Sequence, residues 1–237
     1  MTKKPLVVAM AMVFSTTTYA QESKAVTEFD EVLVTATRIS EKLSDTSRSV
    51  TVINEEKMQE LQPSSVADTL KNEANISVTN GPRSSSQGVE IRGLSGQRVL
   101  QTIDGARQNT NSGHRGTYFM EPELLSSIEV VRGPASSLWG SGAIGGVVAQ
   151  NTKSAQDFLD ENDTFGGYIK QGFETNGDNI KTSGTLYGLA NNIDWLLSGS
   201  YHDSNNIKIG NDKTLENSAS DATSGLAKIG WEPSDDQ

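Results

Sequence analysis

The chain has two histidines, His114 and His202, and their imidazole groups are the side chains best suited to coordinate a metal. His114 stands in a polar loop at 111–116, between Gly113 and Gly116. A neutral imidazole nitrogen is a common metal ligand in proteins. A solvated surface histidine is the alternative for His114, and we expect His202 to be such a surface residue. The sequence therefore nominates His114 as a candidate ligand.

The composition excludes several other kinds of chemistry. The 237 residues include no Cys, which rules out thiolate catalysis, Cys-ligated zinc and a disulfide framework. Asp and Glu number 30 against 20 Lys and Arg, a formal net charge of −10, which argues against nucleic acid as a partner. No Ser/His/Asp set, pair of carboxylates or nucleophile elbow stands out. We therefore expect a protein that is not an enzyme.

Gly140, Gly142 and Gly145 fit the spacing G-x-G-x-x-G by letter. A dinucleotide site needs this motif between a strand and a helix. Here a Gly-Pro pair at 133–134 interrupts the preceding strand pattern, and the residues after the motif lead into another strand. We therefore interpret the glycines as positions for tight turns and close backbone approach.

The first 20 residues have the composition of an export signal. Lys3 and Lys4 precede a short apolar run, Pro5 to Phe14, and Ala20 is a small residue that suits signal peptidase. An N-terminal anchor helix is the alternative, but the run is far shorter than the roughly 20 residues that a bilayer requires. We predict a signal peptide at 1–20 and export to a bacterial periplasm or outer membrane.

Short strand and helix patterns alternate over residues 45–151. Asn54 is suited to cap a helix through the following EEKMQEL. Ser65 stands at the start of a second helix pattern, SVADTLKNE, which places Val66 and Leu70 on one face. Short strands broken by Gly, Asn and Pro complete the segment. These patterns predict a small α+β domain.

Regular alternation of apolar and polar residues begins at 165. Phe165, Ile169 and Phe173 would share one face of a strand, and Tyr168 and Lys170 the other. Segments of about ten alternating residues are typical of an outer-membrane β-barrel. A soluble β-sandwich would alternate in the same way, but the export signal favours the barrel. We predict these segments in chain order: a signal peptide at 1–20, a tail at 21–44, an α+β domain at 45–151, a linker at 152–164 and the start of a β-barrel at 165–237.

Taken together, several motifs resemble those of TonB-dependent outer-membrane receptors. The run DEVLVTATR at 30–38 resembles the TonB box of that family, and residues 165–231 are similar to its first barrel strands. Within the family, residues 104–134 most resemble receptors for haem and haemoproteins. The motifs that resemble the plug domain are VEIRGL at 89–94, IDG at 103–105 and IEVVRGPASSLWGSGAIGGVV at 128–148.

The resemblance implies a fold. This fold is an α+β plug domain of short mixed strands and helices, followed by the first roughly four antiparallel strands of a transmembrane β-barrel that has about 22 strands in this family. With room for so few strands, the chain resembles the N-terminal part of a receptor, and we expect a truncated or fragmentary barrel. A truncated chain would remain in the periplasm.

The resemblance also implies a function, which is the uptake of haem or of haem from a haemoprotein across the outer membrane of a Gram-negative bacterium. The implied partners are TonB with ExbB and ExbD, the haem or haemoprotein, and outer-membrane lipid; haem would be cargo rather than an intrinsic cofactor. A ferric-siderophore receptor of the same architecture is one alternative. A soluble periplasmic binding or signalling module made from the plug alone is another.

Individual residues receive roles from the same resemblance. His114 corresponds to a plug histidine that coordinates haem iron, and its partner histidine would lie beyond Gln237. Arg107 or Arg115 would meet a haem propionate through charge-assisted hydrogen bonds, and Tyr118 is a further candidate contact. Arg92 and Arg132 are expected to pair with carboxylates between plug and barrel. The structural motif of the plug would comprise Arg92, Gly93, Arg132, Gly133, Pro134, Gly140, Gly142, Gly145 and Gly146.

The predicted TonB box would act through its backbone. An extended segment can lend its hydrogen bonds to the sheet of a partner. An edge strand of the plug is the alternative, but the position between a polar tail and the plug favours contact with TonB. The box residues are Glu31, Val32, Leu33, Val34, Thr35 and Ala36.

Overall fold

The computed structural model describes residues 33–34, 41–42, 46–108, 118, 120–160 and 163–231. By its internal contacts the chain divides into Met1–Val32 and Leu33–Gln237, and every described residue belongs to the second unit. The predicted signal peptide at 1–20 therefore lies outside the described residues.

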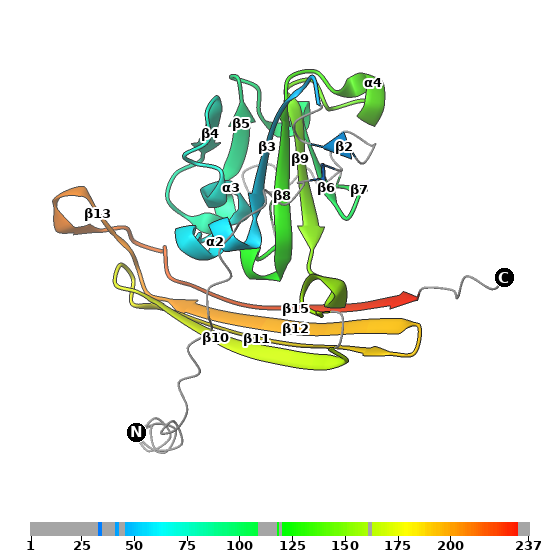
Figure 1. Cartoon of the computed structure of the whole chain (residues 1–237). Helices are drawn as coiled ribbons and strands as arrows, with labels where there is room; N and C mark the ends of the chain where they lie inside the picture. Colours follow the sequence, from blue (N-terminus) through cyan, green and yellow to red (C-terminus); the bar gives the residue numbers. More distant parts are fainter. Residues whose placement is uncertain are drawn as a thin grey trace, which may run out of the picture. The chain divides into compact units, whose positions relative to one another are not determined.

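A five-stranded sheet forms the centre of the α+β domain, residues 46–152 (Figure 1). Neighbouring strands are antiparallel except β6 and β9, which are parallel and place Val99 beside Gly146. In spatial order the strands are β3 (Ser49–Asn54), β8 (Leu125–Arg132), β9 (Gly146–Thr152), β6 (Val99–Ile103) and β7 (Ala106–Gln108).

Short helices and a hairpin complete this domain: α2 (Glu55–Leu61), α3 (Val66–Thr69), α4 (Ser136–Trp139), β4 (Ile76–Thr79) and β5 (Gly88–Ile91). The caps form as predicted, since Asn54 accepts a hydrogen bond from the amide of Lys57 at 3.0 Å and Ser65 accepts one from the amide of Asp68 at 2.9 Å. The second helix is shorter than its pattern predicts. It ends at Thr69 because the next amides bond to carbonyls three residues back, which tightens the chain.

Apolar side chains from α2, α3, the β4–β5 hairpin and the five-stranded sheet form the main core. Val66 and Leu70 are completely buried, as their spacing predicts, and each buried side chain of this size stabilises the fold by about 1.5–3 kcal/mol. A second cluster lies around Trp139 of α4. The main cluster consists of Ile53, Met58, Val66, Ala67, Leu70, Ile76, Val89, Ile91, Val99, Leu125, Ile128, Val130 and Val148.

The glycine motif forms the connection between α4 and β9. Gly140 and Gly142 have φ angles of +74° and +90°, which only glycine adopts readily. Gly146 has a φ of +154°, and a Cβ there would overlap the carbonyl oxygen of Val131. The motif therefore serves tight turns and close backbone approach, and the helix–strand order confirms that it is not a dinucleotide fingerprint.

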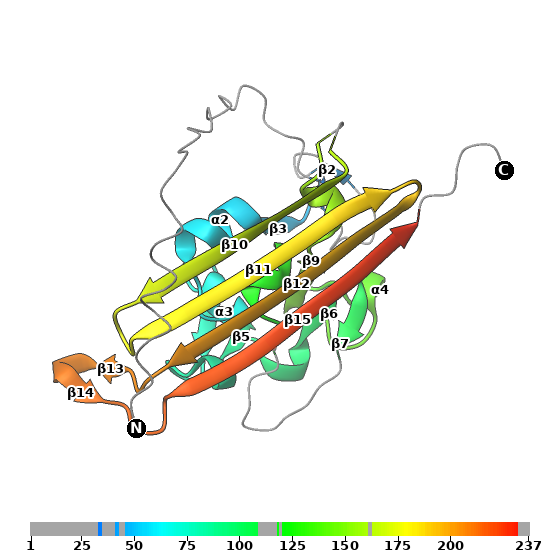
Figure 2. The ribbon, with the colours of Figure 1, turned by 90° about the horizontal axis from the view of Figure 1, so that it is seen from below.

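Four long antiparallel strands form a second sheet, called here the four-stranded sheet (Figure 2). Its strands pair in chain order and are β10 (Phe165–Glu174), β11 (Asn179–Ala190), β12 (Ile193–Ser204) and β15 (Ser220–Trp231). Burial alternates along them as predicted: Phe165, Ile169 and Phe173 are 63%, 84% and 67% exposed, whereas Tyr168 and Lys170 lie on the half-buried face. The loop between β12 and β15 contains a small hairpin, β13 (Lys208–Ile209) and β14 (Lys213–Thr214).

The stretch that we expect to be a linker, 152–164, is packed where it leaves the α+β domain. Lys153 and Ala155 are each 1% exposed. A 3-10 turn at Ala155–Asp157 follows, with Ser154 and Asp157 closing a capping box. The connection therefore fixes the start of the four-stranded sheet close to the end of β9.

Replacement of Gly146 by Ala should destabilise the chain more than replacement of Gly105, which also has a positive φ of +75° but has no atom within 4 Å of the place where a Cβ would stand. Both substitutions strain the backbone, and only Gly146→Ala adds a steric overlap, worth about 1–3 kcal/mol. Urea unfolding followed by circular dichroism measures the difference. Equal midpoints for the two variants would contradict the close approach of β8 and β9.

The carboxyl group of Asp68 should make part of the stability depend on pH. Burial acts to raise its pKa, but hydrogen bonds from the Ser64 amide and from Lys71 hold the pKa below the ordinary value. A lowered pKa adds stability above the unfolded value of about 3.9, and this stability is lost as the pH falls through the folded pKa. Asp68→Asn should therefore be less stable than the wild type at pH 7, and the gap should close in acid. Glu60→Gln, on the exposed side of α2, is the control.

Candidate functional site

The face of the four-stranded sheet that is turned to the α+β domain carries cationic side chains. Each lysine on this face reaches an oxygen of the domain, so the contact between the two parts is polar and directional. The three contacts run from Lys170 Nζ to Glu123 Oε2 at 2.9 Å, from Lys181 Nζ to the Pro63 carbonyl oxygen at 2.9 Å, and from Lys228 Nζ to Thr152 Oγ1 at 3.0 Å.

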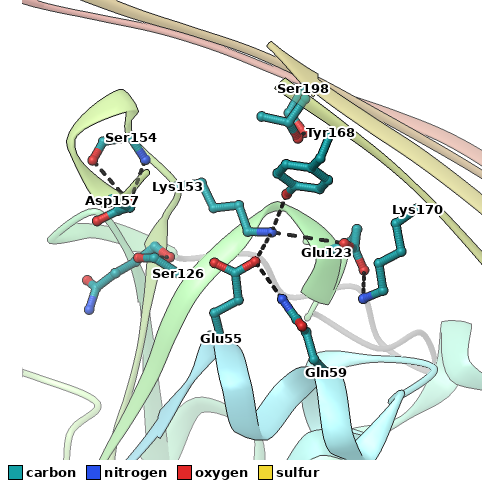
Figure 3. A network of polar contacts seen from close by, with 12 residues as sticks. Glu55, Gln59, Glu123, Ser126, Lys153, Ser154, Asp157, Tyr168, Lys170 and Ser198 are labelled. Atoms are coloured by element: carbon teal, nitrogen blue, oxygen red, sulfur yellow. Dashed lines mark hydrogen bonds and ion pairs between the residues drawn. The ribbon is translucent and has the colours of Figure 1, made fainter. Parts of the chain in front are cut away.

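Lys153 lies at the centre of this contact (Figure 3). Its Nζ is 2.9 Å from Glu55 Oε1 at the start of α2 and donates a hydrogen bond to the Tyr168 hydroxyl of β10 at 2.8 Å. Glu123 Oε1 lies 3.9 Å away and also pairs with Lys170. Burial acts to lower the pKa of Lys153, but the contacts with Tyr168 and Glu55 raise it above the ordinary value. The group therefore stays charged at neutral pH.

Asp104, in a turn of the α+β domain, also takes part in the contact between this domain and the four-stranded sheet. It is the first turn residue of the β6–β7 hairpin, with Gly105 as the second, and both have positive φ as a two-residue hairpin requires. Its carboxylate accepts hydrogen bonds from the Thr152 amide at 2.8 Å and hydroxyl at 2.6 Å, and Lys228 Nζ lies 3.7 Å from it. The IDG motif thus positions the end of β9 against β15.

A cavity of about 670 Å³ separates the α+β domain from the far ends of β10, β11 and β12. Arg83, in the loop between β4 and β5, donates hydrogen bonds to the carbonyl oxygens of Glu216 at 2.8 Å and Asn217 at 3.2 Å. These bonds join the domain to the loop before β15 across one wall of the cavity. Its charged lining residues are Asp68, Lys71, Arg83, Glu174 and Lys181, and His202 also lines it. A volume of this size suits a ligand as large as a cofactor.

The two histidines differ in what the structure shows of them. His114 and its neighbour Arg115 lie outside the described residues, and their roles stay predictions. His202 was expected at the surface, and this expectation is wrong: its side chain is 15% exposed and its Nδ1 lies 3.5 Å from Glu121 Oε1. It stands on the polar face of β12, and the α+β domain covers that face.

Arg107 and Tyr118, the other predicted ligand contacts, lie within the domain. Arg107 Nη1 donates a hydrogen bond to the carbonyl oxygen of Trp139 at 2.7 Å and so holds the end of α4 next to the glycine turns. Tyr118 packs against the main core, and burial raises the pKa of its hydroxyl. Contact of either residue with a ligand stays a prediction.

Arg132 has a different partner from the one expected. Its guanidinium bonds to Ser49 and Thr51 on β3 and lies 3.6 Å from Glu73, so its charge is neutralised within the α+β domain rather than across to the barrel strands. Arg92, with a φ of +51°, places its side chain against Gly133. Both arginines therefore contribute to the structure of the domain itself.

The described part of the predicted TonB box is β1 (Leu33–Val34), which pairs with β2 (Glu41–Lys42). This two-residue pairing is separate from the five-stranded sheet. The rest of the box, Glu31, Val32, Thr35 and Ala36, lies outside the described residues.

No three His, Asp or Glu side chains come together as a metal cluster within the ranges that the structure describes. No helix among the same residues is long and apolar enough to cross a membrane.

Sequence reasoning missed Lys153, Glu55, Glu123 and Arg83 as contacts between the two parts. One signal was present, because a strand with an apolar outer face and lysines on its inner face requires acceptors opposite those lysines. The acceptors themselves carry no such signal, since they lie in short helices and loops far away in the sequence.

A family model described as the TonB-dependent receptor plug domain matches residues 42–147. Heme/hemopexin utilization protein C of Haemophilus influenzae (strain 86-028NP) is 39% identical over 208 residues, which cover 88% of this chain and 29% of that protein. The hemin receptor of Yersinia pestis is 33% identical over 207 residues, covering 85% of this chain and 31% of the receptor. The chain thus spans less than a third of the length of these curated relatives.

A solved structure shows the same arrangement of elements. A double mutant of the Serratia marcescens hemophore receptor HasR, in complex with its hemophore HasA and heme, matches with a TM-score of 0.73 and 30% identity, over 80% of this chain and 30% of that one. The sequence identity and the shared fold lead to one conclusion: the chain belongs to the TonB-dependent receptor family, and residues 42–147 are its plug domain.

Proposed function

We propose that this chain supplies the plug domain and the first barrel strands of an outer-membrane receptor that takes up haem, either free or from a haemoprotein. The observation that carries the proposal is the 39% identity to a heme/hemopexin utilization protein over 88% of the chain. TonB-dependent receptors are outer-membrane proteins that act as receptors and transporters. Because the relatives are much longer, the proposal concerns a receptor of their length, called the full receptor below.

The two faces of the four-stranded sheet support this function. The outer face exposes large apolar side chains, such as Ile169 at 84% and Ile229 at 78%, which suit contact with lipid. The inner face holds the plug through Tyr168, Lys170 and Lys228. An apolar exterior with a polar interior is what a receptor strand requires when the barrel encloses a plug.

Transport would be driven through the TonB box at 31–36. Its described residues, Leu33 and Val34, pair with only two residues of β2. So short a pairing can be exchanged for a strand of TonB at little cost, since main-chain hydrogen bonds to one strand replace those to the other. TonB, energised by ExbB and ExbD, would then pull on the plug and open a path for haem.

Replacement of His114 by Ala should weaken haem binding to the full receptor, because the imidazole would be lost as an axial ligand of the iron. Titration with haem, followed in the Soret band, measures the affinity. Binding to the wild type should also weaken below about pH 6.5, where histidine takes up a proton and ceases to be a ligand.

Two controls sharpen this test. Ser112→Ala lies in the same loop and removes no imidazole, so its haem spectrum should match the wild type. If His114→Ala also matches the wild type in spectrum and affinity, the ligand role is wrong and a ferric siderophore becomes the better cargo. A protein that is found in the soluble periplasmic fraction would instead favour a plug-only module.

Proline substitution in the predicted box should abolish uptake and leave haem binding intact. Val32→Pro removes a backbone N–H and fixes φ, so the segment can no longer pair fully with a partner strand. Growth on haem as the iron source and haem binding to whole cells measure the two effects. Val26→Pro, in the tail before the box, is the matched control and should leave both unchanged. Loss of binding together with uptake would identify the segment as a structural strand of the plug.

A further inference from the structure

Charged side chains of alternating sign form a row across the contact between the plug and β10 (Figure 3). In order they are Glu55, Lys153, Glu123 and Lys170, and their charges sum to zero. The outer links are short, since Glu55 to Lys153 and Glu123 to Lys170 each span 2.9 Å. The middle link is longer, with Lys153 Nζ 3.9 Å from Glu123 Oε1. The row therefore consists of two close ion pairs that stand next to each other.

Glu123 stands between the two lysines. Its Oε2 accepts a hydrogen bond from Lys170 of β10, while its Oε1 is the oxygen that lies 3.9 Å from Lys153. The backbone keeps Lys153 close to Glu123, because the Lys153 amide donates a hydrogen bond to the carbonyl oxygen of Leu124 at 3.1 Å. Glu123 and Lys153 are thus joined through their own segments, and α2 takes no part in this bond.

Glu55 belongs to a different part of the plug. It is the first residue of α2, which directly follows β3, and β3 stands at the edge of the five-stranded sheet. An edge strand is held from one side, so the β3–α2 segment can shift while β8 and β9 keep their pairing. Such a shift would take Glu55 away from Lys153 and leave Glu123 within reach of it.

The burial of the two lysines decides which of them would then keep a partner. The side chain of Lys153 is 2% exposed, whereas that of Lys170 is 28% exposed. A buried ammonium group without a counter-ion is costly, and one that water can reach loses little when its partner leaves. With one carboxylate of the row left for both lysines, the arrangement of lower free energy has Glu123 on Lys153 and Lys170 in water.

We propose that Glu123 is an exchangeable partner: when Glu55 withdraws with α2, Glu123 moves from Lys170 to Lys153, and Lys170 is released. The loss of one contact inside the plug is thereby passed to β10, where it opens a contact with the barrel wall. Lys153 stays neutralised throughout, so the exchange leaves no buried charge uncompensated. The proposal rests on the proposed function for the cause of the shift, which is a pull by TonB on the chain before β3.

The test uses the full receptor in detergent without haem, and Glu55→Gln imitates the withdrawal of the carboxylate. Acetylation with N-hydroxysuccinimidyl acetate, followed by mass spectrometry of the lysine peptides, measures how readily each lysine reacts. Lys170 should react faster in Glu55→Gln than in the wild type by about two- to fivefold, the range of an exposed ion pair. Lys153 should stay protected. Glu123→Gln, which removes the partner of Lys170 directly, sets the rate for full release.

Two further variants serve as controls. Glu60→Gln lies in the same helix and breaks the exposed pair with Lys57, which spans 2.7 Å, so it should speed the reaction of Lys57 and leave that of Lys170 unchanged. Glu55→Asp keeps an acidic residue at the start of the helix and shortens the side chain by one methylene. It should release Lys170 in part, and it replaces Glu55→Gln if that variant does not fold.

Thermal unfolding of the same receptors gives an independent measurement. If Glu123 can replace Glu55, the double variant Glu55→Gln/Glu123→Gln should lower the Tm by clearly more than the two single variants together, because the double variant leaves Lys153 without either carboxylate of the row. Additive shifts in Tm, or an unchanged rate at Lys170 in both Glu55 variants, overturn the proposal.

Hemin binding, measured separately in the Soret band, keeps this result distinct from the proposed function. A receptor that binds hemin and does not release Lys170 overturns the exchange and keeps the proposed function. A receptor that releases Lys170 and binds no hemin supports the exchange and contradicts that function.

Discussion

One buried ammonium group holds the plug against the first barrel strand. Lys153 follows directly after the last strand of the plug sheet, is 1% exposed, and meets Glu55 from the plug and Tyr168 from β10. The rings of Phe158 and Tyr168 lie within 6 Å of the charge and shield it from water. Removing one partner from such a pair leaves an uncompensated buried charge, at a cost of about 3–5 kcal/mol. The position of β10, and through it of the whole four-stranded sheet, depends on this contact.

Other polar contacts between the plug and the four-stranded sheet lie along the rest of the sheet. Three lysines of the sheet each donate a hydrogen bond to an oxygen of the plug: Lys170, Lys181 and Lys228. The two surfaces are therefore held by directional polar contacts and not by non-directional apolar packing. Polar contacts of this kind can be broken and remade in water more easily than a packed apolar interface. In the proposed function, a plug that moves inside its barrel gains from being held in this way.

At the other end of the strands, the donor lies in the plug and the acceptors are backbone oxygens of the loop before β15. Arg83 binds the carbonyl oxygens of Glu216 and Asn217, so a plug loop and the loop before β15 are connected by backbone acceptors that no side-chain substitution can remove. The cavity lies next to this connection and is bordered by His202. A ligand that enters the cavity would touch the plug, the strands and this loop at once.

The sequence by itself determined the elements and much of their orientation. Asn54 and Ser65 specify where two helices begin, and the alternation from Phe165 onward separates an exposed apolar face from a polar one, because these signals depend on near neighbours. The motifs at 89–94, 103–105 and 128–148 also indicated the family.

Only the tertiary structure decided what covers the polar face. His202 was expected at the surface, yet it stands on that face of β12, where its burial beside Glu121 depends on the plug. Arg132 was expected to pair with a carboxylate of the barrel strands. It pairs instead with Glu73, because the fold brings the segment before β4 close to the end of β8. Lys181 and its acceptor at Pro63 are 118 residues apart. Local patterns carry no information on such pairs, since a charged side chain reveals that it needs a partner but not where the folded chain will place one.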